Sequence, residues 1–522
     1  MKMHSRLAAG YLLVTFLAGL LIAGCTTSVD QSQSSKAPLV KTTHGVISGS
    51  VDDGIYSFKG IPYAKAERFM PPQAPDSWKG VRDATRFGPI AMQVNSWSPE
   101  EAMDEHKLFT VNVWTQGIND GKKRPVMFWL HGGGFAVGAS DDPITDGKML
   151  AQKGDVVLVS VNHRLNIMGF LDLSSVDKKY ADSANVGMLD AIAALKWVNK
   201  NIKNFGGDPD NVTILGESGG GGKVGTLMAM PAAHGLFHKA IIQSGTLVNI
   251  MTKEQSTAIG EALVEEVGDL NKLLTMPYKE LVAAGDRALA KTVGVRTPGS
   301  LKVTGFVPVP DGVNLVQQPF TPGFAEFSKN IPLLIGTTLN ELVRTAYGEK
   351  DLTLEQAKTR LQSVYGDNTD KYIALYAKSY QTFTPQDLLS LDTVFRPTTI
   401  KVADAWSAAS NAPVYAYLLT WKSPVDDASK GSFHGLDIPL AFKNLELGKH
   451  WTGSTEESHI LAEQMSSAWI NFARTGNPNA DNLPAWKAYT RENGETLIFD
   501  VEPKIVNHHD RELMEFVVSQ PK

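Results

Sequence analysis

Apolar residues along the chain follow two periods, one typical of buried strands and one typical of helices. Residues 156–161 form a continuous, β-branched-rich run, as in strands buried on both faces of a sheet, and the runs 211–215 and 239–243 are further strand candidates. Between the first two runs, residues 188–201 place apolar side chains at helical spacing. Strands and helices in alternation predict an α/β fold with a doubly wound, mostly parallel sheet and helices on both faces.

The regions around this pattern predict a strand-rich start and two helical insertions. Residues 40–50 and 57–63 predict a hairpin and a further strand, because short β-type runs are separated by glycine. Two segments, 252–293 and 353–382, have helical patterns between strands of the sheet. We expect them either to cover a functional site as a cap or only to pack against the core. An amphipathic helix over 462–474 is expected to end the fold.

The first residues predict a secretion signal outside the fold. Lys2 and Arg6 precede an apolar stretch, 11–22, that is too short to span a membrane comfortably as a mature helix. The sequence Leu-Ile-Ala-Gly-Cys that ends at Cys25 resembles a bacterial lipobox. This resemblance implies cleavage before Cys25 and attachment of lipid to its thiol. A secretory signal without lipid is the alternative.

Cysteine usage favours the lipidated form. Cys25 is the only cysteine, so it forms no internal disulfide, and the polar, unpatterned residues after it are typical of a flexible tether. Thr26 rather than aspartate follows it, which by resemblance to Gram-negative lipoproteins implies the outer membrane. We therefore expect a signal peptide over 1–24, a tether over 25–38 and one folded domain over 39–516. The protein would be held by lipid at the bacterial cell envelope, at the outer membrane or the periplasmic face.

The amino-acid composition limits the classes of partner and cofactor that we expect this chain to bind. The 522 residues are 43% hydrophobic and 20% charged, with a formal net charge of −5, as in an ordinary globular protein. No basic run or stripe is present, so nucleic acid is not expected as a partner. The chain also lacks HExxH and CxxC motifs and a ladder of carboxylates, so we expect neither a metal nor another cofactor.

The most informative motif is Gly-Glu-Ser-Gly-Gly at 216–220, which directly follows an apolar run at 212–215. A G-x-S-x-G sequence after a buried strand is typical of a nucleophile elbow, in which the strand turns sharply into a helix with serine at the tip. Side chains two residues before and after the serine would collide in that turn, and Gly216 and Gly220 carry none. The pattern predicts Ser218 as a nucleophile.

A second glycine motif, His-Gly-Gly-Gly-Phe at 131–135, follows the apolar strand candidate 125–130. A glycine loop lets backbone N–H groups face a bound substrate oxygen, which is the requirement for an oxyanion hole. A flexible turn between strands is the alternative. His131 is expected to support the loop through a backbone hydrogen bond.

A serine nucleophile needs a base and an acid that orients the base. In α/β-hydrolases these residues follow the serine in the order acid, histidine, each in a loop after a strand. Glu341 follows the strand candidate 332–337, and His434 lies in a glycine-flanked loop after 413–419. Topology alone leaves this assignment open, because acidic residues are common in loops.

The chain resembles the type-B carboxylesterase and cholinesterase-like family over nearly all of its mature length, and most of all the bacterial para-nitrobenzyl-esterase-like members. The resemblance implies an α/β-hydrolase fold, with helical insertions that form a cap over the active site. The matching blocks, in chain order, are residues 58–64, 68–69, 111–114, 131–135, 161–165, 185–190, 205–209, 216–220, 240–245, 433–435 and 472–478.

The resemblance also implies an activity, the hydrolysis of small carboxylic esters through an acyl-enzyme. It makes Ser218 the nucleophile, Glu341 the acid and His434 the base. The oxyanion donors it implies are the backbone N–H groups of three glycines, namely Gly133, Gly134 and Gly219. Hydrolysis of activated amides or lactones is an alternative with the same residues, and a non-catalytic binding module is another.

Two departures from the family pattern concern the site. Gly219 replaces the usual alanine after the serine and begins a run of four glycines, so the first turn of the following helix is expected to be looser. The usual acidic-cysteine block is replaced by 105–110, which leaves the local salt bridges open. Glu217, next to the serine, is expected either to tune His434 electrostatically or only to fix the elbow.

Overall fold

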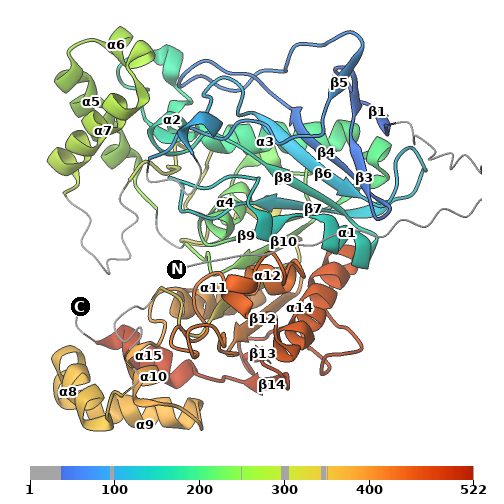
Figure 1. Cartoon of the computed structure of the whole chain (residues 1–522). Coiled ribbons are helices and arrows are strands. Elements are labelled where there is room, and N and C mark those ends of the chain that lie inside the picture. Colours follow the sequence, from blue (N-terminus) through green and yellow to red (C-terminus); the bar gives the residue numbers. More distant parts are fainter. Residues whose placement is uncertain are drawn as a thin grey trace, which may run out of the picture. The chain divides into compact units, whose positions relative to one another are not determined.

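A single large sheet organises the folded part of the chain (Figure 1). Its strand order is β14-β13-β12-β11-β10-β9-β7-β8-β6-β4-β3, and the strands from β8 to β13 in this order run parallel. The computed structural model describes residues 37–94, 99–247, 250–294, 305–342, 349 and 351–520.

Most strands are short and buried, and a small second sheet, β1-β2-β5, adjoins the start of the fold. The strands are β1 (Leu39–Lys41), β2 (Val46–Ser48), β3 (Ser50–Asp52), β4 (Ile55–Pro62), β5 (Val81–Asp83), β6 (Thr110–Thr115), β7 (Arg124–Leu130), β8 (Val157–Val161), β9 (Gly207–Glu217), β10 (Lys239–Gln243), β11 (Leu333–Thr338), β12 (Val414–Leu419), β13 (Glu495–Phe499) and β14 (Lys504–Asn507).

The helices connect these strands or form insertions between them. They are α1 (Lys148–Gly154), α2 (Asn166–Phe170), α3 (Val186–Asn201), α4 (Gly219–Leu227), α5 (Lys253–Val267), α6 (Leu270–Thr275), α7 (Tyr278–Thr292), α8 (Leu354–Tyr365), α9 (Thr369–Ser379), α10 (Pro385–Leu389), α11 (Phe395–Ala409), α12 (Asp437–Ala441), α13 (Lys449–Thr452), α14 (Glu456–Thr475) and α15 (Arg511–Ser519).

The central strands are apolar on both faces, because each face packs against helices. Along β7, Phe128 and Leu130 belong to one core, whereas Met127 and Trp129 belong to the core on the other face. Helices α3 and α4 cover the first face, and α14 covers the second. The predicted α/β fold with a mostly parallel sheet and helices on both faces is therefore confirmed.

The expected end of the fold was wrong. The helix expected over 462–474 begins earlier, at Glu456, because the Thr455 side chain accepts the backbone N–H of Ser458 and caps it. The chain then returns to the sheet in β13 and β14 and finishes in α15. The run Thr496-Leu497-Ile498-Phe499 is a buried strand that pairs with β12.

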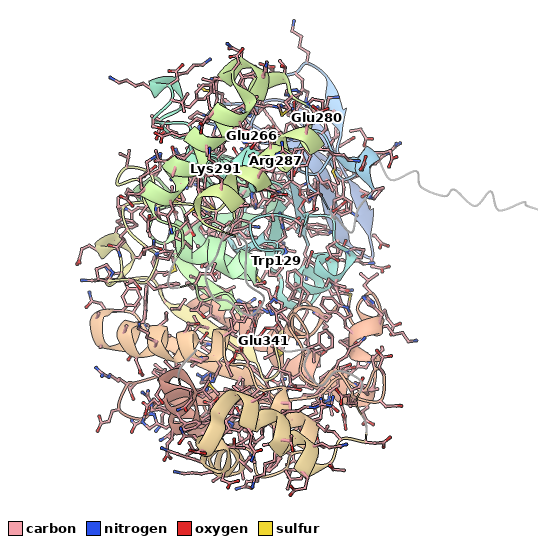
Figure 2. All side chains as sticks on the ribbon, turned by 90° about the vertical axis from the view of Figure 1, so that its left-hand side faces the viewer. Trp129, Glu266, Glu280, Arg287, Lys291 and Glu341 are labelled. Carbon is pink, nitrogen blue, oxygen red and sulfur yellow. The ribbon has the colours of Figure 1, made fainter. Side chains whose placement is uncertain are left out.

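Both helical insertions are present, at opposite ends of the sheet. Helices α5 to α7 occupy the segment expected at 252–293, and α8 and α9 occupy the segment at 353–382. In Figures 1 and 2 the two groups lie apart, and in Figure 2 Glu341 lies between them. They flank this region of the sheet, and their role as a cap stays a prediction.

Close contacts fasten the first insertion to the body of the fold. The guanidinium of Arg68 donates to the carbonyl oxygens of Leu273 and Met276 at the end of α6 and pairs with Glu105 at 2.7 Å. The salt bridge left open by the sequence at 105–110 is therefore present. On α5, a side chain at Gly260 would lie 1.8 Å from the carbonyl oxygen of Asp172, so the helix approaches the body backbone to backbone.

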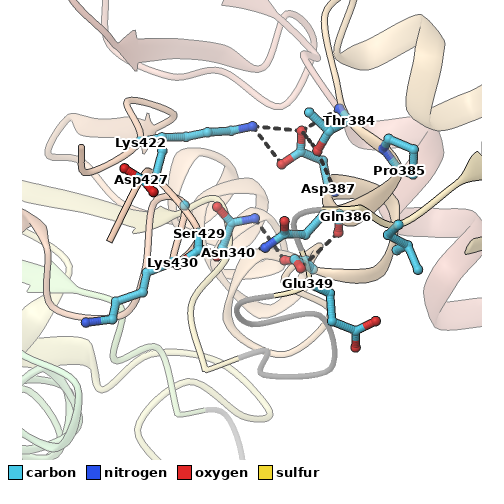
Figure 3. A pocket seen from close by; sticks show the side chains of 14 residues that line it. Asn340, Glu349, Thr384, Pro385, Gln386, Asp387, Lys422, Asp427, Ser429 and Lys430 are labelled. Atoms are coloured by element: carbon cyan, nitrogen blue, oxygen red, sulfur yellow. Dashed lines mark hydrogen bonds and ion pairs between the residues drawn. The ribbon is translucent and has the colours of Figure 1, made fainter. Parts of the chain in front are cut away.

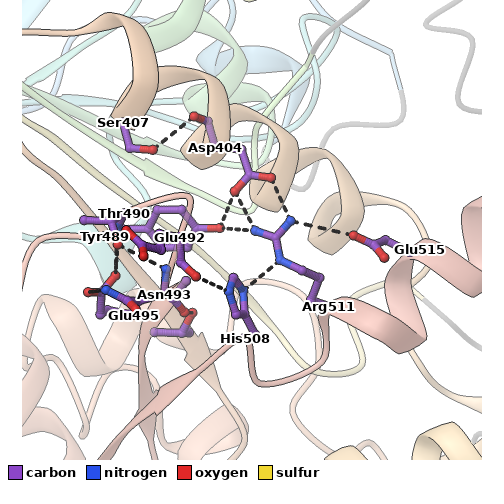
Figure 4. Close-up of polar contacts among 12 residues, drawn as sticks. Asp404, Ser407, Tyr489, Thr490, Glu492, Asn493, Glu495, His508, Arg511 and Glu515 are labelled. Carbon is purple, nitrogen blue, oxygen red and sulfur yellow. Dashed lines mark hydrogen bonds and ion pairs between the residues drawn. The ribbon is translucent and has the colours of Figure 1, made fainter.

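Two ion pairs fasten the C-terminal helix α15 to α11. Arg396 of α11 makes a bidentate pair with Asp510, and both side chains are almost fully buried. Asp404 pairs with Arg511 at 2.6 Å, within the polar network of Figure 4. His508 takes part in that network, because its Nδ1 atom accepts from Nε of Arg511 and its Nε2 atom lies 2.7 Å from the carbonyl oxygen of Glu492.

The N-terminal features expected from the sequence lie outside the described residues. These are the signal peptide over 1–24, Cys25 and nearly all of the tether over 25–38. Within the described ranges, no helix combines the length and apolar character needed to cross a membrane. The expected segment boundaries stay predictions.

We predict that Arg396→Met destabilises the fold by about 3–5 kcal/mol, because it leaves the buried Asp510 without its charged partner. The measurement is the midpoint of urea denaturation followed by fluorescence. Arg287→Met is the control, since the Arg287–Glu266 pair of α7 and α5 lies at the surface (Figure 2) and should contribute less than about 1 kcal/mol. Equal shifts in the two variants would contradict the prediction.

Candidate active site

Ser218 stands at a strained turn between β9 and α4. Its φ is +55°, in the left-handed region that side chains rarely adopt, and its side chain is partly exposed. A Cβ at Gly216 would lie 2.4 Å from the backbone carbon of Gly220, and one at Gly220 would lie 2.0 Å from the carbonyl oxygen of Leu130. The two glycines are therefore required by steric contact, and the elbow predicted from the motif is present.

His434 and Glu341 are brought together at the carboxyl end of the sheet. The Nδ1 atom of His434 forms a very short hydrogen bond with Oε2 of Glu341. Their backbones are also joined, because the N–H of His434 donates to the carbonyl oxygen of Glu341 at 3.1 Å. Glu341 follows β11 and His434 follows β12, which are parallel neighbours, so both loops emerge at the same edge as Ser218.

The Glu341 carboxylate is held by donors on its second oxygen. Ser244 donates its hydroxyl to Oε1 at 2.6 Å, and the backbone N–H of Thr338 donates at 2.8 Å. The side chain is 1% exposed, and its own backbone has a φ of +42°. These donors fix the carboxylate against the imidazole.

Glu217 approaches the other side of the same imidazole. Its Oε1 atom lies 3.3 Å from Nε2 of His434, and the carboxylate is 5% exposed. Burial raises the pKa of Glu217, although the charge of His434 acts against this. For His434, burial lowers the pKa, but the charges of Glu217 and Glu341 outweigh it and the net direction is upward. The approach of Glu217 to the imidazole favours the first of its two expected roles, the electrostatic tuning of His434, which stays a prediction.

The glycine loop after β7 packs directly on the elbow. Gly133 and Gly134 have φ values of +87° and +66°, which favour glycine. A Cβ at Gly219 would lie 1.9 Å from the carbonyl oxygen of Gly134, so the two segments meet at their backbones. Within the described ranges, no hydrogen bond uses the N–H groups of these three glycines, which leaves them available to a substrate oxygen. His131 supports the loop, since its Nδ1 lies 2.9 Å from the carbonyl oxygen of Gly132.

Three further residues of the site were missed from the sequence. Ser244 was absent from the candidate set, although it is a donor to Glu341. The ring of Phe395 stacks on the imidazole of His434, with centroids 5.3 Å apart and planes at 14°. Asp392 accepts the backbone N–H groups of Phe395 and Arg396 and so fixes the start of α11. Ser244 lies in the matching block 240–245, which assigned it no role, whereas Phe395 and Asp392 belong to no motif and are found only by proximity in the fold.

A polar pocket of about 300 Å³ lies beside the acid loop (Figure 3). Asn340 lines it, and Lys422 pairs with Asp387 across it at 2.7 Å. Neither Ser218 nor His434 lines this pocket, so it is separate from the catalytic candidates. Within the described part of the chain, no three His, Cys, Asp or Glu side chains gather in a group that could hold a metal ion.

Comparisons with known proteins agree with this geometry. Residues 36–517 match the carboxylesterase family. The chain is 37% identical to the para-nitrobenzyl esterase of Bacillus subtilis over 492 residues, which cover 91% of this chain and 97% of the relative. It is 31% identical to the phenmedipham hydrolase of Pseudarthrobacter oxydans, covering 88% of this chain and 94% of that one.

Solved structures give the same result. An esterase from Clostridium hathewayi that hydrolyses aliphatic aromatic polyesters superposes with a TM-score of 0.83 at 35% identity, covering 93% of this chain and 99% of that one. A para-nitrobenzyl esterase structure gives 0.74 at 36% identity, covering 92% and 99%. The protein is an α/β-hydrolase that hydrolyses carboxylic esters. The chain belongs to the carboxylesterase family, as the resemblance of its motifs predicts.

We predict that Glu217→Gln moves the acidic limb of the pH profile of kcat/KM to lower pH. The charge of Glu217 raises the pKa of His434, so its removal lowers that pKa, and the base becomes neutral and active at a lower pH. Glu463→Gln, on a surface carboxylate that pairs with Lys153, is the control and should leave the limb in place. A limb that stays fixed or moves upward in Glu217→Gln would contradict the prediction.

Proposed function

We propose that Ser218 is the nucleophile, His434 the base and Glu341 the acid of a serine esterase acting on small carboxylic esters. The observation that carries this proposal is the contact of His434 with two carboxylates. Glu341 binds its Nδ1, and Glu217, the residue directly before Ser218, approaches its Nε2. Because Glu217 adjoins Ser218 in the chain, this contact supports a base near the elbow, where it must take the serine proton.

The cycle follows from these positions. His434 removes the proton from the Ser218 hydroxyl as its oxygen attacks the ester carbonyl carbon, and Glu341 stabilises the resulting imidazolium. The carbonyl oxygen becomes an oxyanion, which the N–H groups of Gly133, Gly134 and Gly219 bind. His434 then gives its proton to the departing alcohol, which leaves an acyl group on Ser218. A water molecule, activated in the same way, releases the acid.

We also propose that lipid on Cys25 holds the enzyme at the bacterial cell envelope after removal of the signal peptide. The support is the lipobox-like sequence before Cys25 and the polar stretch between it and β1, which is long enough to act as a tether. A lipid-anchored esterase would meet esters at the outer membrane or the periplasmic face.

We predict that Ser218→Ala lowers kcat on an aryl ester by about 10⁴-fold or more, because no other group can form the acyl-enzyme. The same variant should lose covalent labelling by a fluorophosphonate, whereas in the wild-type protein mass spectrometry should place the label on the peptide that contains Ser218. Labelling elsewhere, or more than a few per cent of wild-type kcat, would overturn the assignment of the nucleophile.

The variant Glu341→Gln tests the role of Glu341 as the acid in the same assay. The amide is nearly isosteric but cannot stabilise the imidazolium, so kcat should fall by about 10⁴-fold while circular dichroism stays unchanged. Asp404→Asn, in the distant network of Figure 4, is the control for loss of a partly buried, ion-paired carboxylate outside the site. A near-wild-type kcat in Glu341→Gln would move the acid role to another residue.

We predict that Cys25→Ser transfers the protein from the membrane fraction to the soluble fraction, because the thiol that would carry the lipid is absent. Immunoblots of salt-washed membranes measure the distribution, and metabolic labelling with palmitate should be lost in parallel. Ser28→Ala, three residues further along, should keep both. Continued sedimentation of Cys25→Ser with washed membranes would exclude lipid at this cysteine as the anchor.

A further inference from the structure

Lys223 is a fully buried lysine directly behind the candidate nucleophile, in α4. Its Nζ atom donates a hydrogen bond of 2.8 Å to the carbonyl oxygen of His131 and lies 6.0 Å from the ring centroid of Phe135. His131 and Phe135 are the first and last residues of the glycine loop 131–135. One side chain therefore contacts the loop at both of its ends.

The surroundings of Lys223 are unusual for a charged group. Within the described ranges the hydrogen-bond partner of its Nζ atom is a carbonyl oxygen and not a carboxylate, and burial lowers its pKa to about 7. It faces the imidazoles of His131 and His163, which stack with centroids 5.0 Å apart. Burial first, and then the charge of Lys223, lowers the pKa of each imidazole well below its usual range. Such a buried amine costs stability, which points to a functional role.

The loop that Lys223 contacts consists largely of glycine. Three successive glycines, 132 to 134, contribute no side-chain packing, and glycine is the most flexible residue. An oxyanion hole works only if its N–H groups are fixed before the charge develops. Lys223 is also the first residue after the glycine run 219–222 that has a side chain to anchor α4 against the loop.

We propose that Lys223 is a positioning residue of the oxyanion hole, which clamps the glycine loop at His131 and Phe135 against the helix behind Ser218. It stabilises the transition state through the loop and touches neither the substrate nor the reacting atoms. The hydrogen bond to His131 needs only an N–H group, which both the ammonium and the neutral amine supply. The inference rests on the proposed function, since it requires the loop to bind the oxyanion.

The test is Lys223→Met, which keeps the length of the side chain and removes the donor. Turnover is measured per active site, with the sites titrated by a fluorophosphonate. We expect kcat to fall at least tenfold while KM changes less than about threefold, because only transition-state binding is lost. The affinity for a trifluoromethyl ketone, which adds to the serine and forms an oxyanion, should fall by a similar factor.

Lys239→Met is the matched control. Lys239 is also a buried lysine, and burial lowers its pKa to about 8. It lies at the start of β10 and contacts Asn211, so it is at the amino ends of the strands, whereas Ser218 follows the carboxyl end of β9. It should keep kcat per site within about twofold of the wild type. If Lys223→Met yields too few titratable sites, Lys223→Gln, which keeps an N–H donor, takes its place. Its kcat and its affinity for the trifluoromethyl ketone are compared with those of the wild type. Both should fall by less than tenfold.

The outcomes separate the clamp from the proposed function. The proposed function itself would be overturned if the trifluoromethyl ketone does not inhibit the wild type. It would also be overturned if Ser218→Ala keeps the turnover of the wild type. A different result would overturn only the clamp. In that case the wild type is active and is inhibited by the trifluoromethyl ketone, but Lys223→Met keeps both kcat per site and affinity for the ketone unchanged. Equal losses in Lys223→Met and Lys239→Met would also overturn it, because they would indicate a general effect of removing a buried lysine.

Discussion

The site depends on one steric constraint, the contact of backbone with backbone around Ser218. Side chains at Gly219 and Gly220 would lie 1.9 and 2.0 Å from the carbonyl oxygens of Gly134 and Leu130. Only glycine permits such approaches. The end of β9, the start of α4 and the loop after β7 therefore meet through backbone atoms at this turn. This contact sets the candidate nucleophile beside the candidate oxyanion donors.

Around that turn the fold buries charges that are unfavourable when alone. His434 lies between the carboxylates of Glu217 and Glu341, and Lys223 lies buried behind the glycine loop. Charges in a medium of low polarity interact strongly and demand fixed partners. The burial of apolar side chains on both faces of the sheet offsets the free-energy cost of burying these charges. The charged and polar groups of the site are therefore oriented before the substrate binds.

Distant elements support the imidazole as well. Phe395, which stacks on His434, begins α11, and two other residues of that helix, Arg396 and Asp404, pair with the start of α15. The last helix of the fold is therefore linked through α11 to the candidate base. Loss of the buried Arg396–Asp510 pair should therefore appear as lost stability.

The sequence by itself determined the α/β pattern, the elbow at Ser218 and the glycine loop, because each is a contiguous pattern whose physics is local. For Glu341 and His434, loop position left alternatives open, and the resemblance of ordered motifs narrowed them to one pair. Only the tertiary structure decided which groups surround that pair. Glu217 on Nε2, Phe395 on the ring and the late strands β13 and β14 depend on strand order and helix packing. Contacts between residues far apart in the chain leave no periodic signal in the sequence, because they arise only when the whole core is assembled.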